Sequence, residues 1–152
     1  MLHFEVKSFD ELTKAELYEL LQLRAEVFVV EQDCPYQDLD GKDVRALHVL
    51  GKLGGTLVAY TRCFPPGAYF EEASIGRVVV RPSSRKKNYG IQLMEHSIAV
   101  VKEHFATSLI RISAQCYLLE FYGSLGFQTD SGEYLEDGIP HKSMVYGKNN
   151  KI

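Results

Sequence analysis

The sequence predicts an α/β protein built on a mixed β-sheet, and three features of its pattern support this fold class. Segments with apolar residues at helical spacing alternate along the chain with β-rich runs. The order strand, turn, helix, strand between Ser74 and Ala114 is a βαβ unit, whose two strands run parallel. The triplet Val78 to Val80 indicates a strand buried on both faces, as in the interior of a mixed sheet.

The first predicted element is a helix from Thr13 to about Val30. Thr13 and Glu16 have the spacing of a capping box, which marks a helix start. Apolar residues then follow a 3.6-residue period at Leu17, Leu20, Leu21 and Phe28. The polar stretch Glu31 to Asp43 that follows is predicted to be a loop, long enough to line a site.

The central part of the chain predicts a hairpin and the βαβ unit. Two β-rich runs, Ala46 to Gly51 and Thr56 to Phe64, flank a connector with two glycines. A third strand, Ser74 to Val80, ends at a proline and is followed by a basic turn. A helix to about His104 comes next, with apolar residues on one face, and then a β-like run at Leu109 to Ser113.

The last part of the chain predicts one more helix and two short strands. The helix spans Leu118 to Leu125 and stops at a glycine. A β-like piece at Phe127 to Asp130, a turn-rich stretch at Ser131 to Pro140 and a strand at Ser143 to Tyr146 complete the chain. No internal repeat or linker is evident, so residues 1–152 are expected to form a single domain.

Composition excludes several classes of function. The longest apolar stretches contain four residues, far from the roughly 20 that cross a bilayer. The first ten residues lack the pattern of a secretory signal, and the three cysteines suit neither a disulfide framework nor a zinc site. The expected location is therefore the cytoplasm. The net charge of −3 gives no general support for binding nucleic acid or an anionic membrane, and no metal site is expected.

A basic turn between the third strand and the following helix is the main candidate for a binding site. Arg81, Arg85, Lys86 and Lys87 put four cations within seven residues, and Gly90 lies where the helix begins. The free N–H groups and the dipole of a helix N-terminus favour phosphate, so this turn predicts an anion cradle. A solvated basic loop is the alternative interpretation of the same residues.

The stretch Val78 to Gly90 resembles the acyl-CoA signature of the GNAT N-acetyltransferases. Gln115, Phe121-Tyr122 and Gly126-Phe127 match the second half of the family pattern. Asn88 stands where the family usually has its first glycine, and Gln115 where it usually has asparagine. Further segments resemble the ElaA-like branch of the superfamily, namely Glu26 to Gln32, Cys34 to Tyr36, Asp40-Gly41 and Glu136 to His141.

The resemblance implies a GNAT fold, a mixed sheet with a V-shaped opening between two central parallel strands, in which acetyl-CoA would lie. The strand backbone would pair with the pantetheine arm, the amides of the turn would hold the pyrophosphate, and no metal is implied. The cofactor-binding residues implied are Val78, Val79, Val80, Arg85, Lys86, Lys87, Asn88, Tyr89, Gly90 and Gln115.

Acetyl transfer to an amine requires a neutral amine, a stabilised oxyanion and a proton for the leaving thiolate. Tyr122 occupies the position of the family's general acid, the alternative being a tyrosine that merely packs in its helix. A carboxylate or histidine must serve as base, and we select Glu31 and His141 from a set that also contains His48, Glu120 and Asp137. No helper residue supports a nucleophilic cysteine, and Arg62 and Arg77 are expected to form structural salt bridges.

The sequence thus predicts an enzyme that moves acetyl from acetyl-CoA to a primary amine of an unidentified acceptor. The acceptor pocket would form from Glu31 to Asp43 and Ser131 to His141, which hold at least seven acidic residues and suit a cationic acceptor such as a polyamine or a lysine or peptide amine. Solvated acidic loops are an equal alternative. A non-catalytic CoA-binding or protein-interaction module, a cradle for another nucleotide, and a homodimer also stay open.

Overall fold

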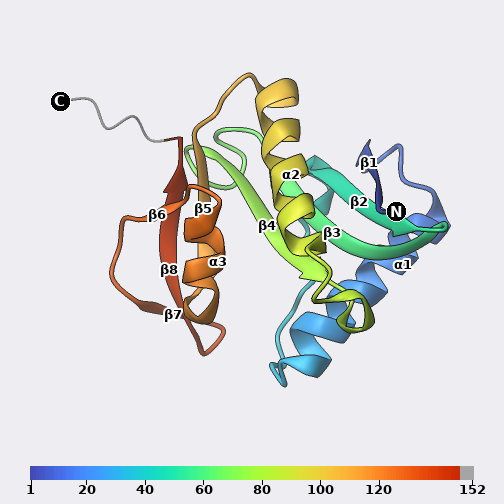
Figure 1. The fold of residues 1–152 in the computed structure, drawn as a ribbon, viewed down its shortest axis with the longest axis horizontal. Coiled ribbons are helices and arrows are strands. Elements are labelled where there is room, and N and C mark those ends of the chain that lie inside the picture. Colours follow the sequence, from blue (N-terminus) through green and yellow to red (C-terminus); the bar gives the residue numbers. More distant parts are fainter. Residues whose placement is uncertain (148–152) are drawn as a thin grey trace.

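The structure, a computed structural model, describes residues 1–147 and shows a mixed α/β fold (Figure 1). Eight strands form one sheet in the order β1-β2-β3-β4-β5-β8-β6, and β7 also pairs with β8. The strands are β1 (His3–Ser8), β2 (Leu47–Leu53), β3 (Thr56–Phe64), β4 (Ala73–Val80), β5 (Ile110–Gln115), β6 (Gln128–Thr129), β7 (Tyr134–Glu136) and β8 (Ile139–Tyr146). The helices are α1 (Lys14–Arg24), α2 (Tyr89–Phe105) and α3 (Leu119–Ser124), with a π-helix at Ala25–Glu31 and 3-10 turns at Asp43–Arg45, Pro82–Ser84 and Cys116–Leu118.

The two halves of the sheet separate along β4 and β5. These strands are parallel, and they pair only at their first residues, Ala73 with Ile110 and Ser74 with Arg111. Every other pair of neighbouring strands is antiparallel. Figure 1 shows β4 and β5 diverging beyond this short contact. The predicted V-shaped opening between two parallel strands is therefore present.

A β-bulge interrupts β4 within this opening. Between the β3–β4 pairs Arg62–Gly76 and Tyr60–Val79, two residues of β4 face a single residue of β3. One of the two, Arg77, has a φ of 50°, a backbone conformation that few side chains other than glycine adopt. Such bulges bend a strand and redirect its side chains, and this one lies at the wall of the opening.

The sheet buries apolar side chains on both faces. Under α2 and α3, the core contains residues of the sheet and helices such as Ala59, Ile75, Leu93, Met94, Ile98, Ile112 and Phe127. Under α1, a second cluster contains Leu20, Leu23, Val27, Leu50, Leu57, Tyr60 and Val79. Val79 is buried in the second cluster, while Val78 and Val80 are partly buried against the first, so the triplet packs on both faces but only Val79 is fully buried.

Most predicted elements are present, with three differences. The capping box at Thr13 starts α1 as predicted, but the chain leaves the α-helix after Arg24 and continues to Glu31 as a π-helix. The strand β1, which pairs with β2, and the short β7 were not predicted. Finally, β8 begins at Ile139 instead of Ser143, so the stretch predicted as turns contributes its end to the sheet.

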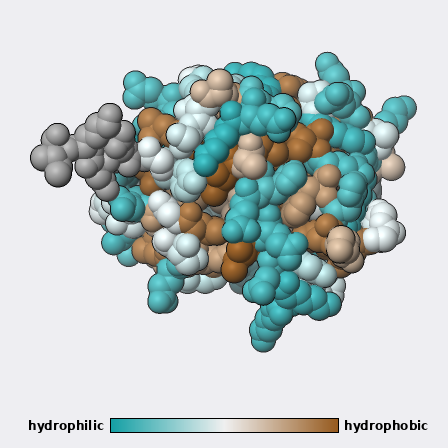
Figure 2. All heavy atoms as spheres, turned by 45° about the horizontal axis from the view of Figure 1, so that its top comes forward, coloured by the Kyte–Doolittle hydropathy of each residue, from teal (hydrophilic) through white to brown (hydrophobic). Residues whose placement is uncertain are grey.

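The surface is mixed in character. On the face drawn in Figure 2, hydrophobic residues lie in separate groups among hydrophilic ones. Of the helices within residues 1–147, none combines the length and the apolar character that crossing a membrane requires.

Candidate active site

A cavity of about 580 Å³ occupies the space between the diverging strands β4 and β5. Its walls come from both strands, the start of α2, α3, the end of the π-helix with the loop that follows, and the β7–β8 turn. Eleven of the predicted site residues line it: Val78, Val79, Val80, Arg85, Lys86, Asn88, Tyr89, Gly90, Gln115, Tyr122 and His141. Two predicted residues, Lys87 and Glu31, are not among the lining residues.

The basic turn forms one end of the cavity at the N-terminus of α2. Lys86 and Asn88 both have left-handed backbone conformations, with φ of 66° and 62°. Asparagine tolerates this region better than most residues, so it replaces the usual glycine without losing the turn. Gly90 lies in the first turn of α2, and a Cβ at this position would meet only the ring of Phe121, at 3.4 Å. The free N–H groups of this first turn can therefore be approached by an anion.

Arg85 is held at the edge of the turn by Glu31. Its Nη1 and Nη2 donate to the two carboxylate oxygens of Glu31 at 2.6 and 2.8 Å, and its Nε donates to the Val80 carbonyl at 3.0 Å. The hydrogen bonds from Arg85 lower the pKa of Glu31, which makes this carboxylate a weaker base. Because it lies outside the cavity as well, the geometry disfavours the catalytic role predicted for Glu31 and makes it a partner of Arg85.

Tyr122 lies in α3 with its side chain buried against the cavity, 6% exposed. Its ring makes edge-to-face contacts with Phe121 and Phe127, at centroid distances of 5.1 and 5.9 Å. Its hydroxyl has no hydrogen-bond partner within residues 1–147. Burial raises the pKa of this phenol, so it carries its proton at neutral pH. The phenol on the cavity wall thus has a proton to give, but its raised pKa makes it a weak acid, so donation depends on its position against the leaving group.

Gln115, at the end of β5, is joined to Gln32 across the cavity. Nε2 of Gln115 donates to Oε1 of Gln32 at 3.3 Å, and Nε2 of Gln32 donates to Oε1 of Gln115 at 3.2 Å. Gln32 directly follows the π-helix and was not predicted as a site residue. The two residues are 83 positions apart in sequence, so no local pattern could have paired them.

His141 lies on β8 and is 5% exposed. Its Nδ1 is 2.7 Å from the Ile139 carbonyl, and since a carbonyl only accepts, Nδ1 carries the hydrogen. Its Nε2 is 3.6 Å from Oε2 of Glu136, whose Oε1 accepts a hydrogen bond of 2.9 Å from Ser113. Glu136 was not predicted as a site residue.

The other candidates for the base lie in different surroundings. His48 is fully buried between the Tyr60 hydroxyl and the Asp43 carbonyl, and this burial lowers its pKa. Glu120 is exposed on α3 and does not line the cavity, whereas Asp137 does. Among the described residues, no group of three or more His, Cys, Asp or Glu side chains is placed to hold a metal ion.

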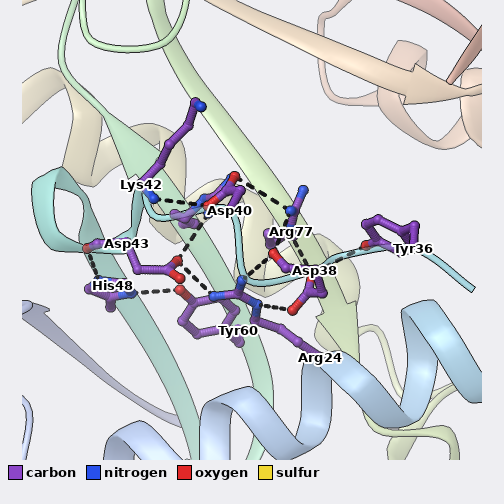
Figure 3. A network of polar contacts seen from close by, with 10 residues as sticks. Arg24, Tyr36, Asp38, Asp40, Lys42, Asp43, His48, Tyr60 and Arg77 are labelled. Carbon is purple, nitrogen blue, oxygen red and sulfur yellow. Dashed lines mark hydrogen bonds and ion pairs between the residues drawn. The ribbon is translucent and has the colours of Figure 1, made fainter. Parts of the chain in front are cut away.

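The loop after the π-helix is held by a buried ionic network (Figure 3). Asp38 is 4% exposed, and its Oδ2 accepts a hydrogen bond of 2.9 Å from Arg24 Nε. Its Oδ1 lies 2.7 Å from Arg77 Nε. Arg24 also donates to Asp43 at 2.8 Å. Tyr36, which lines the cavity, donates its hydroxyl to Asp38 at 3.2 Å. The network therefore fixes the cavity wall formed by this loop and ties it to the bulge in β4.

A second part of the network confirms the salt bridges predicted for Arg62 and Arg77 and corrects the charge expected of the loop. Arg62 donates to both oxygens of Asp40 at 2.9 Å and to Asp43 at 3.0 Å. Burial alone would raise the pKa of Asp40, but the hydrogen bonds from Arg62 outweigh it and lower that pKa. Three carboxylates of the loop thus neutralise the protein's own arginines. The expectation that this loop offers a strongly acidic lining to a cationic acceptor is wrong.

Comparison with known proteins agrees with this geometry. The family model described as an acetyltransferase (GNAT) domain matches residues 14–147. The chain is 41% identical over 147 residues to protein ElaA of Escherichia coli, covering 95% of this chain and 96% of ElaA. A crystal structure of an acyl-CoA N-acyltransferase from Pseudomonas aeruginosa superposes with a TM-score of 0.89 at 40% identity, covering 95% of this chain and 99% of that one. An N-acetyltransferase from Thermoplasma acidophilum, solved in complex with coenzyme A, shares the fold with a TM-score of 0.69 at 15% identity, covering 95% and 98%.

Proposed function

The chain belongs to the GNAT acetyltransferase family, and from this premise we propose that it transfers the acetyl group of acetyl-CoA to a primary amine. The observation that carries the proposal is one cavity that combines a basic turn at a helix N-terminus, a strand edge and a buried tyrosine. The similar fold of a protein solved with coenzyme A supports the choice of cosubstrate.

The residues present fit acetyl-CoA along the length of the cavity. The first turn of α2 and the cation Lys86 suit the pyrophosphate, because free N–H groups and positive charge meet there, and Arg85 would add its charge only on leaving Glu31. The stretch of β4 that has left β5 offers a strand edge to the amides of the pantetheine arm. Gln115 would reach the arm only after exchanging its hydrogen bond with Gln32 for one with the pantetheine.

Two residues of the cavity wall, Tyr122 of α3 and His141 of β8, serve the proton transfers. The thioester supplies an activated acetyl group, and its cleavage releases a thiolate that needs a proton. Tyr122 donates that proton, since burial keeps its hydroxyl protonated and leaves it without a competing partner in residues 1–147. His141 accepts a proton from the amine through Nε2, because Nδ1 already donates to the Ile139 carbonyl. General acid and base steps of this kind contribute roughly 10²- to 10⁴-fold each.

We place the enzyme in the cytoplasm. Its three cysteines, Cys34, Cys63 and Cys116, are all free thiols in the structure. Unpaired cysteines suit a reducing compartment.

The proposal is tested by combining a binding and a turnover measurement. Calorimetry should show that acetyl-CoA and CoA bind, whereas ATP and NADH do not. A panel of primary amines should then release CoA from acetyl-CoA, with the acetylated amine identified by mass spectrometry. Binding of CoA with no amine-dependent release would contradict the proposal and favour a non-catalytic CoA-binding module. Binding of another nucleotide in preference to CoA would contradict the assignment of the turn.

A further inference from the structure

One wall of the cavity carries a polar cluster that the proton transfers above do not explain. Glu136 of β7 lies between Ser113 of β5 and His141 of β8, and all three line the cavity. Ser113 donates to Oε1 of Glu136 at 2.9 Å, and Tyr134 can in turn donate its hydroxyl to Ser113. The ring of Tyr134 stacks on that of His141, with centroids 6.1 Å apart. These contacts hold one oxygen of the Glu136 carboxylate, whose side chain is 46% exposed, and leave the other free.

The free oxygen of Glu136 and the ring of His141 place two hydrogen-bond acceptors near each other. Oε2 of Glu136 and Nε2 of His141 are 3.6 Å apart, and within residues 1–147 neither atom receives a hydrogen bond. His141 as a whole is 5% exposed and is one of the residues that line the cavity. One nitrogen donor can reach both atoms, because N–H···O and N–H···N contacts span roughly 2.7–3.2 Å. The donor that fits carries at least two hydrogens.

The charge of this wall favours a cationic donor. In the loop that follows the π-helix, the carboxylates of Asp38, Asp40 and Asp43 form ion pairs with arginines of the protein itself. Two carboxylates line the cavity, Glu136 and Asp137, and of these Glu136 is the one in contact with His141. Among the described residues no lysine or arginine lies within 4.0 Å of the Glu136 carboxylate. Glu136 therefore presents an uncompensated negative charge beside the proposed base.

We propose that Glu136 is the acceptor-recognising residue, which binds the ammonium form of a primary alkylamine and holds its nitrogen against His141. The inference rests on the proposed acetyl transfer and adds to it the class of acceptor. An uncharged amine, such as an arylamine at neutral pH, has no positive charge for this carboxylate to recognise. The enzyme therefore selects alkylammonium acceptors over neutral amines.

The proton balance of the reaction follows from these positions. The ammonium group gives one proton to Nε2 of His141, which frees the lone pair that forms the C–N bond to the acetyl carbon. The C–S bond breaks with its electron pair on sulfur, and Tyr122 supplies the proton that yields the CoA thiol. The second proton lost by the nitrogen restores Tyr122. The sum is one alkylammonium and one acetyl-CoA converted to one amide, one CoA and one proton, which His141 passes to solvent.

The experiment compares the wild type with Glu136→Gln, which keeps the shape of the side chain and removes its charge. Glu133→Gln is the matched control, because Glu133 lies on the same segment and does not line the cavity. Acetylation of n-butylamine and of aniline is followed by CoA release, and binding of n-butylammonium to the CoA-saturated protein is measured by calorimetry. Glu136→Gln should raise the KM for n-butylamine by roughly tenfold or more, since hydrogen bonds to charged groups are the strong ones. The KM for aniline and the affinity for CoA should not change.

Each outcome decides between the two proposals. Loss of n-butylammonium binding in Glu136→Gln, with Glu133→Gln behaving as wild type, supports the recognition site whether or not turnover is seen. Equal KM and equal binding in wild type and Glu136→Gln would overturn it, as would a parallel loss for aniline, which indicates a structural role. If Asp137→Asn loses n-butylammonium binding and Glu136→Gln does not, the recognising carboxylate is Asp137 and the assignment to Glu136 is wrong. If the wild type binds n-butylammonium and CoA yet releases no CoA with any amine, acetyl transfer fails while recognition stands.

Discussion

Replacing Asp38 by Asn should destabilise the protein and disturb the acceptor side of the cavity. The substitution keeps the size of the side chain but removes the charge that faces Arg24, which is 0% exposed, and Arg77. Removing one partner of a buried ion pair typically costs about 3–5 kcal/mol. Arg24 keeps its 2.8 Å hydrogen bond to Asp43, so we expect the lower end, about 3 kcal/mol. For a chain of this length that is a fall in Tm of about 6–12 °C.

Urea unfolding followed by circular dichroism measures this effect. The midpoint should fall while the slope m stays constant, which shows that stability has changed and not the compactness of either state. Asp10→Asn is the control, since Asp10 is exposed on the turn before α1 and forms no ion pair within residues 1–147. Because Tyr36 and its loop lose their anchor, the KM for the acceptor should rise while CoA affinity stays unchanged. An Asp38→Asn protein that unfolds at the same urea concentration as wild type would refute the stabilising role of the network.

Three further outcomes follow from the site and from the electrostatics. Tyr122→Phe should lower kcat by roughly 10²- to 10⁴-fold with CoA affinity unchanged in calorimetry, and a wild-type kcat under conditions where chemistry limits the rate would remove Tyr122 as the acid. Gly90→Val should weaken CoA binding by placing a side chain at the phosphate-binding turn, so a folded variant with wild-type affinity would show that the turn is misassigned. Burial alone would raise the pKa of Glu16, but hydrogen bonds from Lys7, Thr13 and Lys52 lower it from 4.5 to about 2. Because its pKa is lower in the folded protein, Glu16 stabilises the fold above pH 4.5, and this stability is lost as the pH falls toward 2. In Glu16→Gln the urea midpoint should therefore decline less between pH 4.5 and 2 than in wild type. An equal decline in both proteins would contradict the stabilising role of Glu16.

The parts of the fold that were predicted from sequence depend on neighbours in the chain. The capping box at Thr13 and the turn at Asn88 each involve residues a few positions apart, and both have the expected geometry. The parallel pairing of β4 and β5 follows from the handed connection through α2. The edge strand β1 was missed because its place depends on pairing with β2, about 40 to 50 residues away.

The parts of the site that were missed depend on contacts between distant residues. Composition alone showed an acidic loop, but it could not show that Arg24, Arg62 and Arg77 come from α1, β3 and β4 to meet its carboxylates. For the same reason Glu31 was selected as a candidate base, whereas Arg85, 54 residues later, engages it. Glu136 lay in the predicted acceptor segment but was not selected as a site residue, because only the β7–β8 pairing brings it beside His141.

Direct transfer requires acetyl-CoA and the amine to occupy the cavity between β4 and β5 at the same time. Calorimetry with a bisubstrate analogue, in which an acetyl bridge joins the sulfur of CoA to the nitrogen of n-butylamine, measures this property. Linking the two parts makes the second contact intramolecular, so the analogue should bind the wild type more tightly than CoA does, and prior saturation with CoA should block it. Equal affinities of the analogue and CoA would contradict simultaneous occupancy and, with it, direct transfer in this cavity.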